Sequence, residues 1–212
     1  MGFDLREIVV EQTSYKAFGA SIDHYHAILA HLSTYFNDSI IVDLGTHRGG
    51  SAAALSYNKS NEVYTFDITP HEEAVELFKE DEYKNITYII GNCIENNWYG
   101  QPMGPFSTNL SEPLKSEKEI FLSSELIFVD IDPHNGIQEA AVLDFLVEND
   151  YKGIMVCDDI GGHGNNFHPA MRDWWNSIEL ATYNIANKYA SGTGTGIICF
   201  DNQEVLSDVR IP

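Results

Sequence analysis

Acidic side chains that suit metal binding and proton transfer gather in two short segments of this 212-residue chain. Asp130, Asp132 and His134 follow the apolar run LIFV, and Asp158 and Asp159 follow IMVC. Oxygen-only ligands at this density suit Mg²⁺, with Mn²⁺ or Ca²⁺ as alternatives, whereas Zn²⁺ prefers His or Cys among its ligands. Asp132 also has a simpler explanation, since it can cap the helix that follows it. The sequence therefore predicts that Asp130, Asp158 and Asp159 hold one divalent cation.

The segments that precede these acids have the composition of buried β-strands. Residues 126–129 and 154–157 are short, unbroken apolar runs, as expected for strands covered on both faces of a parallel sheet. Neighbouring parallel strands end at one edge, where open α/β sheets bind ligands. Two unit charges 4 Å apart repel by roughly 4 kcal/mol at an effective dielectric constant near 20. A divalent cation would remove that repulsion if the two strands are neighbours.

Residues 40–54, IIVDLGTHRGGSAAA, predict a strand, a glycine turn and the start of a helix. This arrangement brings backbone N–H groups close to a ligand. The turn differs from the dinucleotide fingerprint G-x-G-x-x-G, because the bulky His47 and Arg48 stand between Gly45 and Gly49. The sequence thus indicates a cofactor site here. It disfavours NAD or FAD and the nucleotide-dependent oxidoreductases that use them.

Hydrophobic periodicity and turn residues predict the remaining elements. After a second strand at residues 63–66, Thr69 as N-cap, Pro70 at the first helical position and Glu72 in a capping box predict a helix over residues 70–79. Further strands are expected over 86–90, 182–189 and 196–200, and further helices over 21–37, 116–123, 136–147 and 169–178. Strands that alternate with helices predict an α/β fold, a doubly wound, mostly parallel sheet with a C-terminal antiparallel hairpin.

Length and composition fit one domain. The chain is 43% hydrophobic, which is enough for one sizeable core, and a single domain over residues 1–212 is expected. Residues 1–20 show no clean period and are interpreted as an N-terminal arm or lid. Residues 95–118 are interpreted as a long inserted loop.

The charge of the chain and its cysteines indicate which binding partners and which cellular compartment to expect. Twelve Lys plus Arg stand against 32 Asp plus Glu, a formal charge of −20. Such a surface repels nucleic acids and anionic membranes, so neither is expected as a partner. Cys157 and Cys199 lie in apolar runs and are expected as reduced core residues. No secretion signal or membrane-length apolar segment is visible, which predicts a cytoplasmic protein and leaves open whether it forms a homo-oligomer.

The pattern D-x-G-T-x-x-G-G-S at residues 43–51 resembles the first motif of class I methyltransferases that use S-adenosylmethionine. The segments FVDIDPH and VCDDI make the resemblance more specific. Metal-dependent O-methyltransferases, including the catechol type and the sugar O-methyltransferases of macrolide and aminocoumarin biosynthesis, have an aspartate ending the fourth strand and an Asp-Asp or Asp-Asn pair ending the fifth. The inserted loop lies outside the resemblance, so the methyl acceptor is not identified.

The resemblance implies roles for individual residues. Asp67, after the second strand, takes the place of the acid that accepts hydrogen bonds from both ribose hydroxyls, and Asn92 or Cys93 takes the place of the residue against the adenine amino group. Asp132 matches an acid assigned as general base in the sugar enzymes, and His134 is the alternative base. The expected cofactor contacts are Asp43, Gly45, Thr46, Gly49, Ser51, Asp67, Ile68, Asn92, Cys93 and Asp130.

The activity that this resemblance implies is methyl transfer from S-adenosylmethionine to a hydroxyl of a small molecule, such as a sugar or a catechol-like ring. The metal ion would bind the hydroxyl, lower its pKa and orient it, while Asp132 or His134 takes the proton. His163 and His168 follow the acidic pair and are equally well explained as bystanders. Two alternatives stay open: metal-independent methyl transfer to N or C, with the aspartates as caps, and a non-catalytic domain that binds the cofactor.

Overall fold

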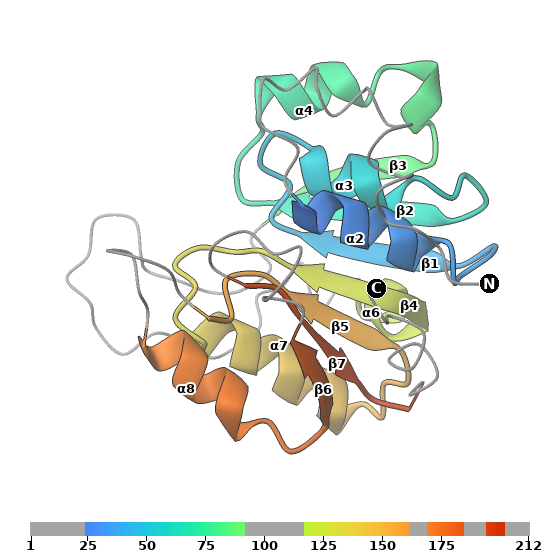
Figure 1. The fold of residues 1–212 in the computed structure, drawn as a ribbon. Helices are drawn as coiled ribbons and strands as arrows, with labels where there is room; N and C mark the ends of the chain where they lie inside the picture. The colour runs from blue at the N-terminus through green and yellow to red at the C-terminus, as the bar shows by residue number, and fades with distance from the viewer. Residues whose placement is uncertain (1–23, 92–116, 162–168, 185–193, 202–212) are drawn as a thin grey trace.

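The computed structural model describes residues 24–91, 117–161, 169–184 and 194–201 (Figure 1). The strands are β1 (Ile40–Leu44), β2 (Glu62–Asp67), β3 (Ile86–Ile90), β4 (Ser124–Val129), β5 (Ile154–Cys157), β6 (Ala181–Asn184) and β7 (Gly196–Cys199). The helices are α2 (His24–Ser33), α3 (Gly50–Leu55), α4 (Glu72–Leu77), α6 (Lys118–Ser123), α7 (Ile137–Glu148) and α8 (Pro169–Ser177), with the 3-10 turn η2 (Asp81–Tyr83).

In this part of the chain the strands form one seven-stranded sheet with the order β3-β2-β1-β4-β5-β7-β6. β1 to β5 pair in parallel, and β7 is antiparallel to both β5 and β6. β4 returns to lie beside β1, so the strand order reverses between these two strands. The predicted doubly wound, mostly parallel sheet with a C-terminal antiparallel hairpin is confirmed.

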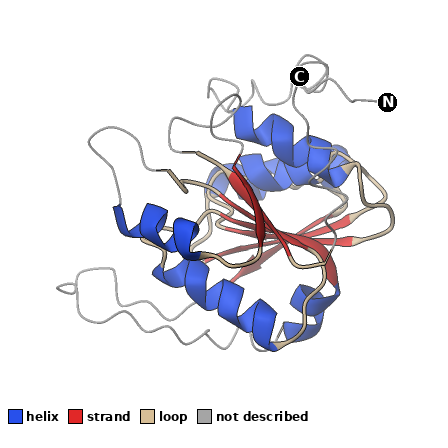
Figure 2. Cartoon of the chain, turned by 60° about the horizontal axis from the view of Figure 1, so that its bottom comes forward, coloured by secondary structure: helices blue, strands red, loops and turns tan. Residues whose placement is uncertain are grey.

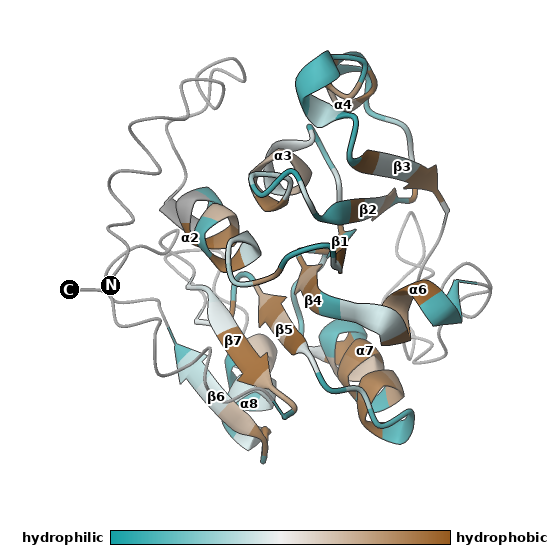
Figure 3. Ribbon diagram, turned by 90° about the vertical axis from the view of Figure 1, so that its right-hand side faces the viewer, coloured by the Kyte–Doolittle hydropathy of each residue, from teal (hydrophilic) through white to brown (hydrophobic). Residues whose placement is uncertain are grey.

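The sheet lies between two layers of helices (Figure 2). Successive strand residues point to opposite faces, and both faces are apolar. On one face, Ile41, Val63 and Leu126 pack with apolar residues of α2 and α3. On the other face, Val42 and Ile127 pack with residues of α6, α7 and α8. Burial on both faces explains the apolar runs at residues 126–129 and 154–157, and Figure 3 shows the hydrophobic colouring of β5 and β7.

The start of α4 differs from the prediction. The helix begins at Glu72, after an extended His71, and not at Pro70 with Thr69 as its cap. The Tyr88 hydroxyl on β3 explains the difference, because it donates to the Thr69 carbonyl oxygen at 3.1 Å and accepts from the His71 N–H at 3.3 Å. These contacts hold residues 69–71 against β3. The capping box predicted from the sequence is therefore not formed.

Some of the other predictions fall inside the described residues, and some fall outside them. Cys157 and Cys199 are buried and free, as predicted. The predicted segment 182–189 begins with β6, and its second half lies outside the described residues. The predicted arm at 1–20 and most of the insertion at 95–118 also lie outside them. No helix within the described ranges is both long enough and apolar enough to cross a membrane.

Candidate active site

The glycine turn after β1 meets the end of β4. An ideal Cβ on Gly45 would lie 1.8 Å from the backbone carbonyl oxygen of Asp130, and Gly45 has a φ of +102°, so only glycine fits there. The Asp130 N–H in turn donates to the Leu44 carbonyl oxygen at 2.9 Å. The N–H groups of Gly45 and Thr46 both donate to the Phe66 carbonyl oxygen of β2. The turn is therefore fixed at the reversal of strand order, where doubly wound sheets bind ligands.

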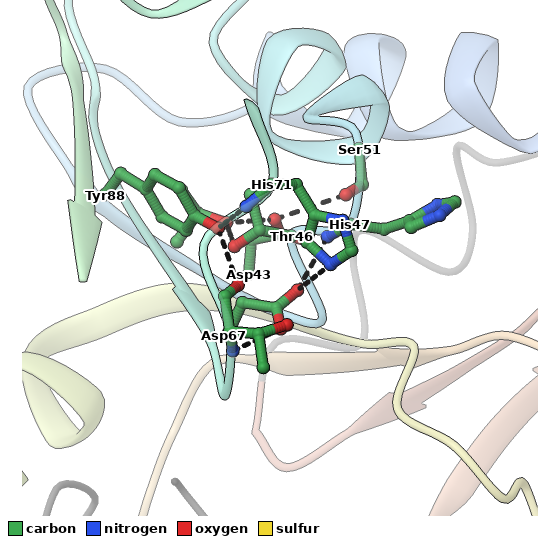
Figure 4. A network of polar contacts seen from close by, with 9 residues as sticks. Asp43, Thr46, His47, Ser51, Asp67, His71 and Tyr88 are labelled. Atoms are coloured by element: carbon green, nitrogen blue, oxygen red, sulfur yellow. Dashed lines mark hydrogen bonds and ion pairs between the residues drawn. The ribbon is translucent and has the colours of Figure 1, made fainter. Parts of the chain in front are cut away.

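Asp43 is fully buried beneath this turn. Its Oδ2 accepts hydrogen bonds from Thr65 Oγ1 at 2.5 Å and Ser51 Oγ at 3.2 Å, and Thr46 Oγ1 lies 2.6 Å from Thr65 Oγ1 (Figure 4). Its Oδ1 has no hydrogen-bond partner among the described residues. Burial raises the pKa of Asp43 to about 7, although the two hydroxyl hydrogen bonds lower it. These buried side chains brace the turn, and Gly49, with a φ of +88°, caps α3.

Asp67 ends β2 beside the same turn. Its Oδ2 accepts a hydrogen bond from the His47 N–H at 2.8 Å, and its Oδ1 accepts one from the Thr69 N–H at 3.1 Å (Figure 4). His71 Nε2 lies 3.7 Å from Oδ2. Each carboxylate oxygen can accept a second hydrogen bond. Asp67 is thus a carboxylate fixed by backbone donors at a strand end, and its contact with a ribose stays a prediction.

Two large apolar side chains are exposed next to Asp67. Ile68 follows Asp67, and Ile90 pairs with Asp67 across β2 and β3; both are 47% exposed. Exposed apolar side chains at the ligand edge of a sheet offer a contact surface for a planar ring. Asn92 and Cys93, the predicted adenine contacts, lie outside the described residues.

The four aspartates after β4 and β5, Asp130, Asp132, Asp158 and Asp159, form a cluster that we call the acidic rim. Val129 and Cys157 are paired in the sheet, so the first acids of the two segments leave neighbouring strands at the same level. Burial raises the pKa of Asp130 well above its usual range, and the charges of Asp158 and Asp159 raise it further. The fold therefore places these acids after neighbouring strands, where their charges act on one another, and their binding of one ion stays a prediction.

The imidazole of His134 lies among these carboxylates. Its Nε2 is 3.5 Å from Asp130 Oδ1, 3.6 Å from Asp132 Oδ1 and 3.5 Å from Asp159 Oδ2. A ring nitrogen that carries hydrogen can donate to such oxygens. Among the described residues, no set of three or more His, Cys, Asp or Glu side chains has the geometry to hold a metal ion. In this conformation His134 Nε2 lies among Asp130, Asp132 and Asp159, at the position where an ion would contact Asp130 and Asp159.

Two side chains near the rim were not predicted from the sequence. Thr195 Oγ1, in the segment before β7, donates a hydrogen bond to Asp158 Oδ1 at 2.8 Å. Glu139, in the first turn of α7, is 1% exposed, and burial raises its pKa to about 7. Both residues look ordinary in the sequence, since neither stands at a strand end or in a motif. His163 and His168 lie outside the described residues.

Solved structures share this fold. A protein from Staphylococcus aureus assigned as a caffeoyl-CoA O-methyltransferase is similar with a TM-score of 0.62 at 13% identity, over 91% of this chain and 91% of that one. The SAH-bound methyltransferase PaMTH1 from Podospora anserina has a TM-score of 0.54 at 16% identity, over 88% and 82% of the two chains. An rRNA methylase from Streptococcus thermophilus has a TM-score of 0.51 at 14% identity, over 86% and 100%. No protein-family model and no curated protein sequence matches the chain.

The strand order and the antiparallel β7 define a Rossmann-like methyltransferase fold, which these neighbours share. The predicted resemblance to class I methyltransferases is confirmed for the architecture of the chain. Identities of 13 to 16% show the fold and not the activity. The activity has to be argued from the glycine turn and the acidic rim.

Proposed function

We propose that this protein is an S-adenosylmethionine-dependent methyltransferase that methylates a hydroxyl group of a small molecule with the help of a divalent metal ion. The observation that carries the proposal is that the acidic rim directly adjoins the glycine turn, with Gly45 against the backbone of Asp130. A methyl donor at the turn and an acceptor at the rim would be neighbours, as in-line displacement requires.

The edge from the turn to β3 offers the contacts that a nucleoside needs. Asp67 would accept hydrogen bonds from the ribose hydroxyls, because its two oxygens are held in place by the N–H groups of His47 and Thr69. Ile68 and Ile90 would contact the adenine ring with their exposed apolar surface. The acidic surface of the chain favours a cationic sulfonium over an anionic ligand.

The chemistry of the acidic rim fits a hard divalent cation. Its donors are carboxylate oxygens, and a positive charge would relieve the repulsion that raises the pKa of Asp130. Asp130, Asp158 and Asp159 would hold Mg²⁺, with Mn²⁺ or Ca²⁺ as alternatives, once the ion displaces His134 Nε2 from its contacts with Asp130 and Asp159. When bound, the ion supplies a charge that lowers the pKa of the acceptor hydroxyl and orients it.

Asp132 of the acidic rim, or His134 beside the rim, would take the proton of that hydroxyl. Asp132 is 72% exposed, so its carboxylate meets solvent and an incoming acceptor. His134 is 15% exposed and directs Nε2 toward the rim. A base within hydrogen-bond reach of the hydroxyl contributes about 10²- to 10⁴-fold to the rate of such reactions. We assign Asp132 or His134 as the general base.

Specific observations bear on the alternatives. Neighbours that are rRNA methylases suggest an RNA acceptor, but a formal charge of −20 opposes binding to a phosphate backbone. A metal-independent methyltransferase acting on N or C is compatible with the His134 ring standing among the acids. A non-catalytic cofactor-binding domain would need no acidic rim. The proposal therefore keeps a small polyhydroxylated or catecholic molecule as the acceptor.

Calorimetry of S-adenosylhomocysteine and of MgCl₂ tests the proposal. The wild-type protein is expected to bind both, and the double variant Asp130→Asn, Asp158→Asn is expected to retain the nucleoside but bind Mg²⁺ more than about 100-fold more weakly. The double variant Asp81→Asn, Asp150→Asn is the matched control, because it removes the same charge from two exposed acids, 91% and 86% exposed.

The outcomes separate the alternatives. Absence of nucleoside binding by the wild type would contradict the proposal as a whole. Nucleoside binding without Mg²⁺ binding, together with methyl transfer that EDTA leaves unchanged, would instead support the metal-independent alternative. Screening polyhydroxylated and catecholic acceptors with labelled S-adenosylmethionine then identifies the acceptor class.

A further inference from the structure

The first turn of α7 buries two polar side chains behind the acidic rim. Gln138 and Glu139 are each 1% exposed. None of their four side-chain oxygen and nitrogen atoms has a hydrogen-bond partner in the described part of the chain. The N–H groups of Gly136 and of Glu139 itself lie near the Glu139 carboxyl and lower its pKa, but burial outweighs them. A buried polar group without a partner destabilises the fold, so this position calls for an explanation.

The side chain that approaches the Glu139 carboxyl from the acidic rim is the His134 ring, by its inner edge. Glu139 Oε1 lies 4.0 Å from His134 Nδ1, and Nδ1 is itself buried with no hydrogen-bond partner. The outer edge of the same ring directs Nε2 to Asp130, Asp132 and Asp159. His134 therefore stands between one buried carboxyl and the acidic rim. Closing 4.0 Å to hydrogen-bond distance takes a shift of about 1 Å and satisfies two buried atoms at once.

The protonation of the ring determines which group donates and which accepts in a hydrogen bond between Glu139 and His134 Nδ1. Nε2 faces carboxyl oxygens of the rim and donates a hydrogen bond to any of them that is ionised. Nδ1 then either accepts a hydrogen bond from a protonated Glu139 or donates one to an ionised Glu139. In both cases one proton lies between Glu139 and Nδ1. A hydrogen bond at one ring nitrogen sets the orientation of the ring and the role of the other nitrogen.

We propose that Glu139 is a positioning residue, which hydrogen-bonds His134 Nδ1 and thereby holds the ring with Nε2 directed at the acidic rim. The inference deepens the proposed function, on which it rests for the role of His134 as a base. Gln138 is as buried as Glu139 and also lacks a hydrogen-bond partner among the described residues, but it is given no role at His134. It provides a control of equal burial, one residue away on the same turn.

Nuclear magnetic resonance of the ligand-free protein tests the inference without any assay of methyl transfer. The full chain is labelled with ¹⁵N-histidine, and the ring nitrogens of His134 are assigned by their loss in His134→Asn. In the wild type we expect Nδ1 to have the shift of a hydrogen-bonded nitrogen in a single ring form. In Glu139→Leu we expect the averaged shifts of a ring that exchanges between its two tautomers.

Two further variants complete the test. Glu139→Gln keeps a donor and an acceptor at the same place and is expected to restore the single ring form, whereas Gln138→Leu is expected to leave the His134 spectrum unchanged. Identical His134 shifts in the wild type and in a folded Glu139→Leu would overturn the inference, as would an equal effect of Gln138→Leu. If Glu139→Leu fails to fold, the shifts of Glu139→Gln decide, since loss of the single ring form there would also overturn it. Failure of the proposed function is seen separately, in the calorimetry.

Discussion

The Thr195 hydroxyl donates a hydrogen bond to Oδ1 of Asp158 across 37 residues of sequence, at 2.8 Å, and both residues are buried. Asp158 follows β5 and Thr195 precedes β7, the antiparallel neighbour of β5. The antiparallel end of the sheet therefore orients an acid of the parallel part. A donor that fixes a carboxylate in this way acts on ligand binding through the orientation of that carboxylate.

Replacing Thr195 by valine tests this relationship. Thr195→Val keeps the shape of the side chain but removes the donor to Asp158, so we expect Mg²⁺ affinity to fall by about 10- to 100-fold. Calorimetric titration of MgCl₂ measures the change. Thr182→Val, at an exposed position of β6, is the matched control and is expected to bind Mg²⁺ like the wild type. Unchanged affinity in a folded Thr195→Val would show that the hydroxyl is dispensable for the ion.

A change at Asp67 tests the nucleoside contacts. In Asp67→Asn, the amide group presents its NH₂ to one of the two backbone donors, the N–H of His47 or of Thr69. Hydrogen bonds to charged groups contribute about 1.5 to 3 kcal/mol, so we expect the Kd for S-adenosylhomocysteine to rise by about 10- to 100-fold. Asp81→Asn, on an exposed side chain, should leave the Kd unchanged. Equal affinities of wild type and Asp67→Asn would remove Asp67 from the site.

The contact of Gly45 with Asp130 predicts a large effect on stability. A methyl group on Gly45 meets the carbonyl oxygen of Asp130 and a positive φ at the same time, so Gly45→Ala is expected to lower the free energy of unfolding by about 3 kcal/mol or more. Gly50→Ala is the comparison, because there the methyl group meets only the end of the His26 side chain. Urea denaturation of both variants should show the larger loss for Gly45→Ala, and the reverse order would contradict the close approach of the two strand ends.

The buried Asp43 predicts a pH dependence of stability. Its pKa is about 7 in the fold against an ordinary value of 3.8, so between these values the folded state keeps a proton that the unfolded chain has released. The free energy of unfolding therefore falls as pH rises from about 4 to 7, by up to about 1.4 kcal/mol per pH unit from this group. Asp43→Asn removes that contribution.

Urea denaturation at pH 5, 6 and 7 measures the contribution of Asp43 to the pH dependence of stability. We expect Asp43→Asn to lose less stability than the wild type over this range, and Asp144→Asn, on an exposed side chain of α7, to follow the wild type. Parallel pH profiles for the wild type and Asp43→Asn would mean that the carboxyl is ionised in the fold over the whole range.

The sequence alone was enough to predict the architecture, because its signals are local. Apolar runs marked the strands β3 and β5 at their full bounds, and the acids at the ends of β4 and β5 pointed to one edge of the sheet. The glycine turn after β1 could be predicted for the same reason, since glycine readily adopts a φ such as the +102° of Gly45, which other residues rarely adopt.

What only the tertiary structure decided are the contacts between segments distant in sequence. Tyr88 replaced the predicted cap of α4, Thr195 met Asp158, and the His134 ring came to lie among the acids with Glu139 behind it. Residue types and spacing determine which face of a strand or helix is apolar. They do not determine which polar side chains contact one another in the folded chain. That choice depends on packing and on the burial of hydrogen-bonding groups, which exist only once the chain has folded.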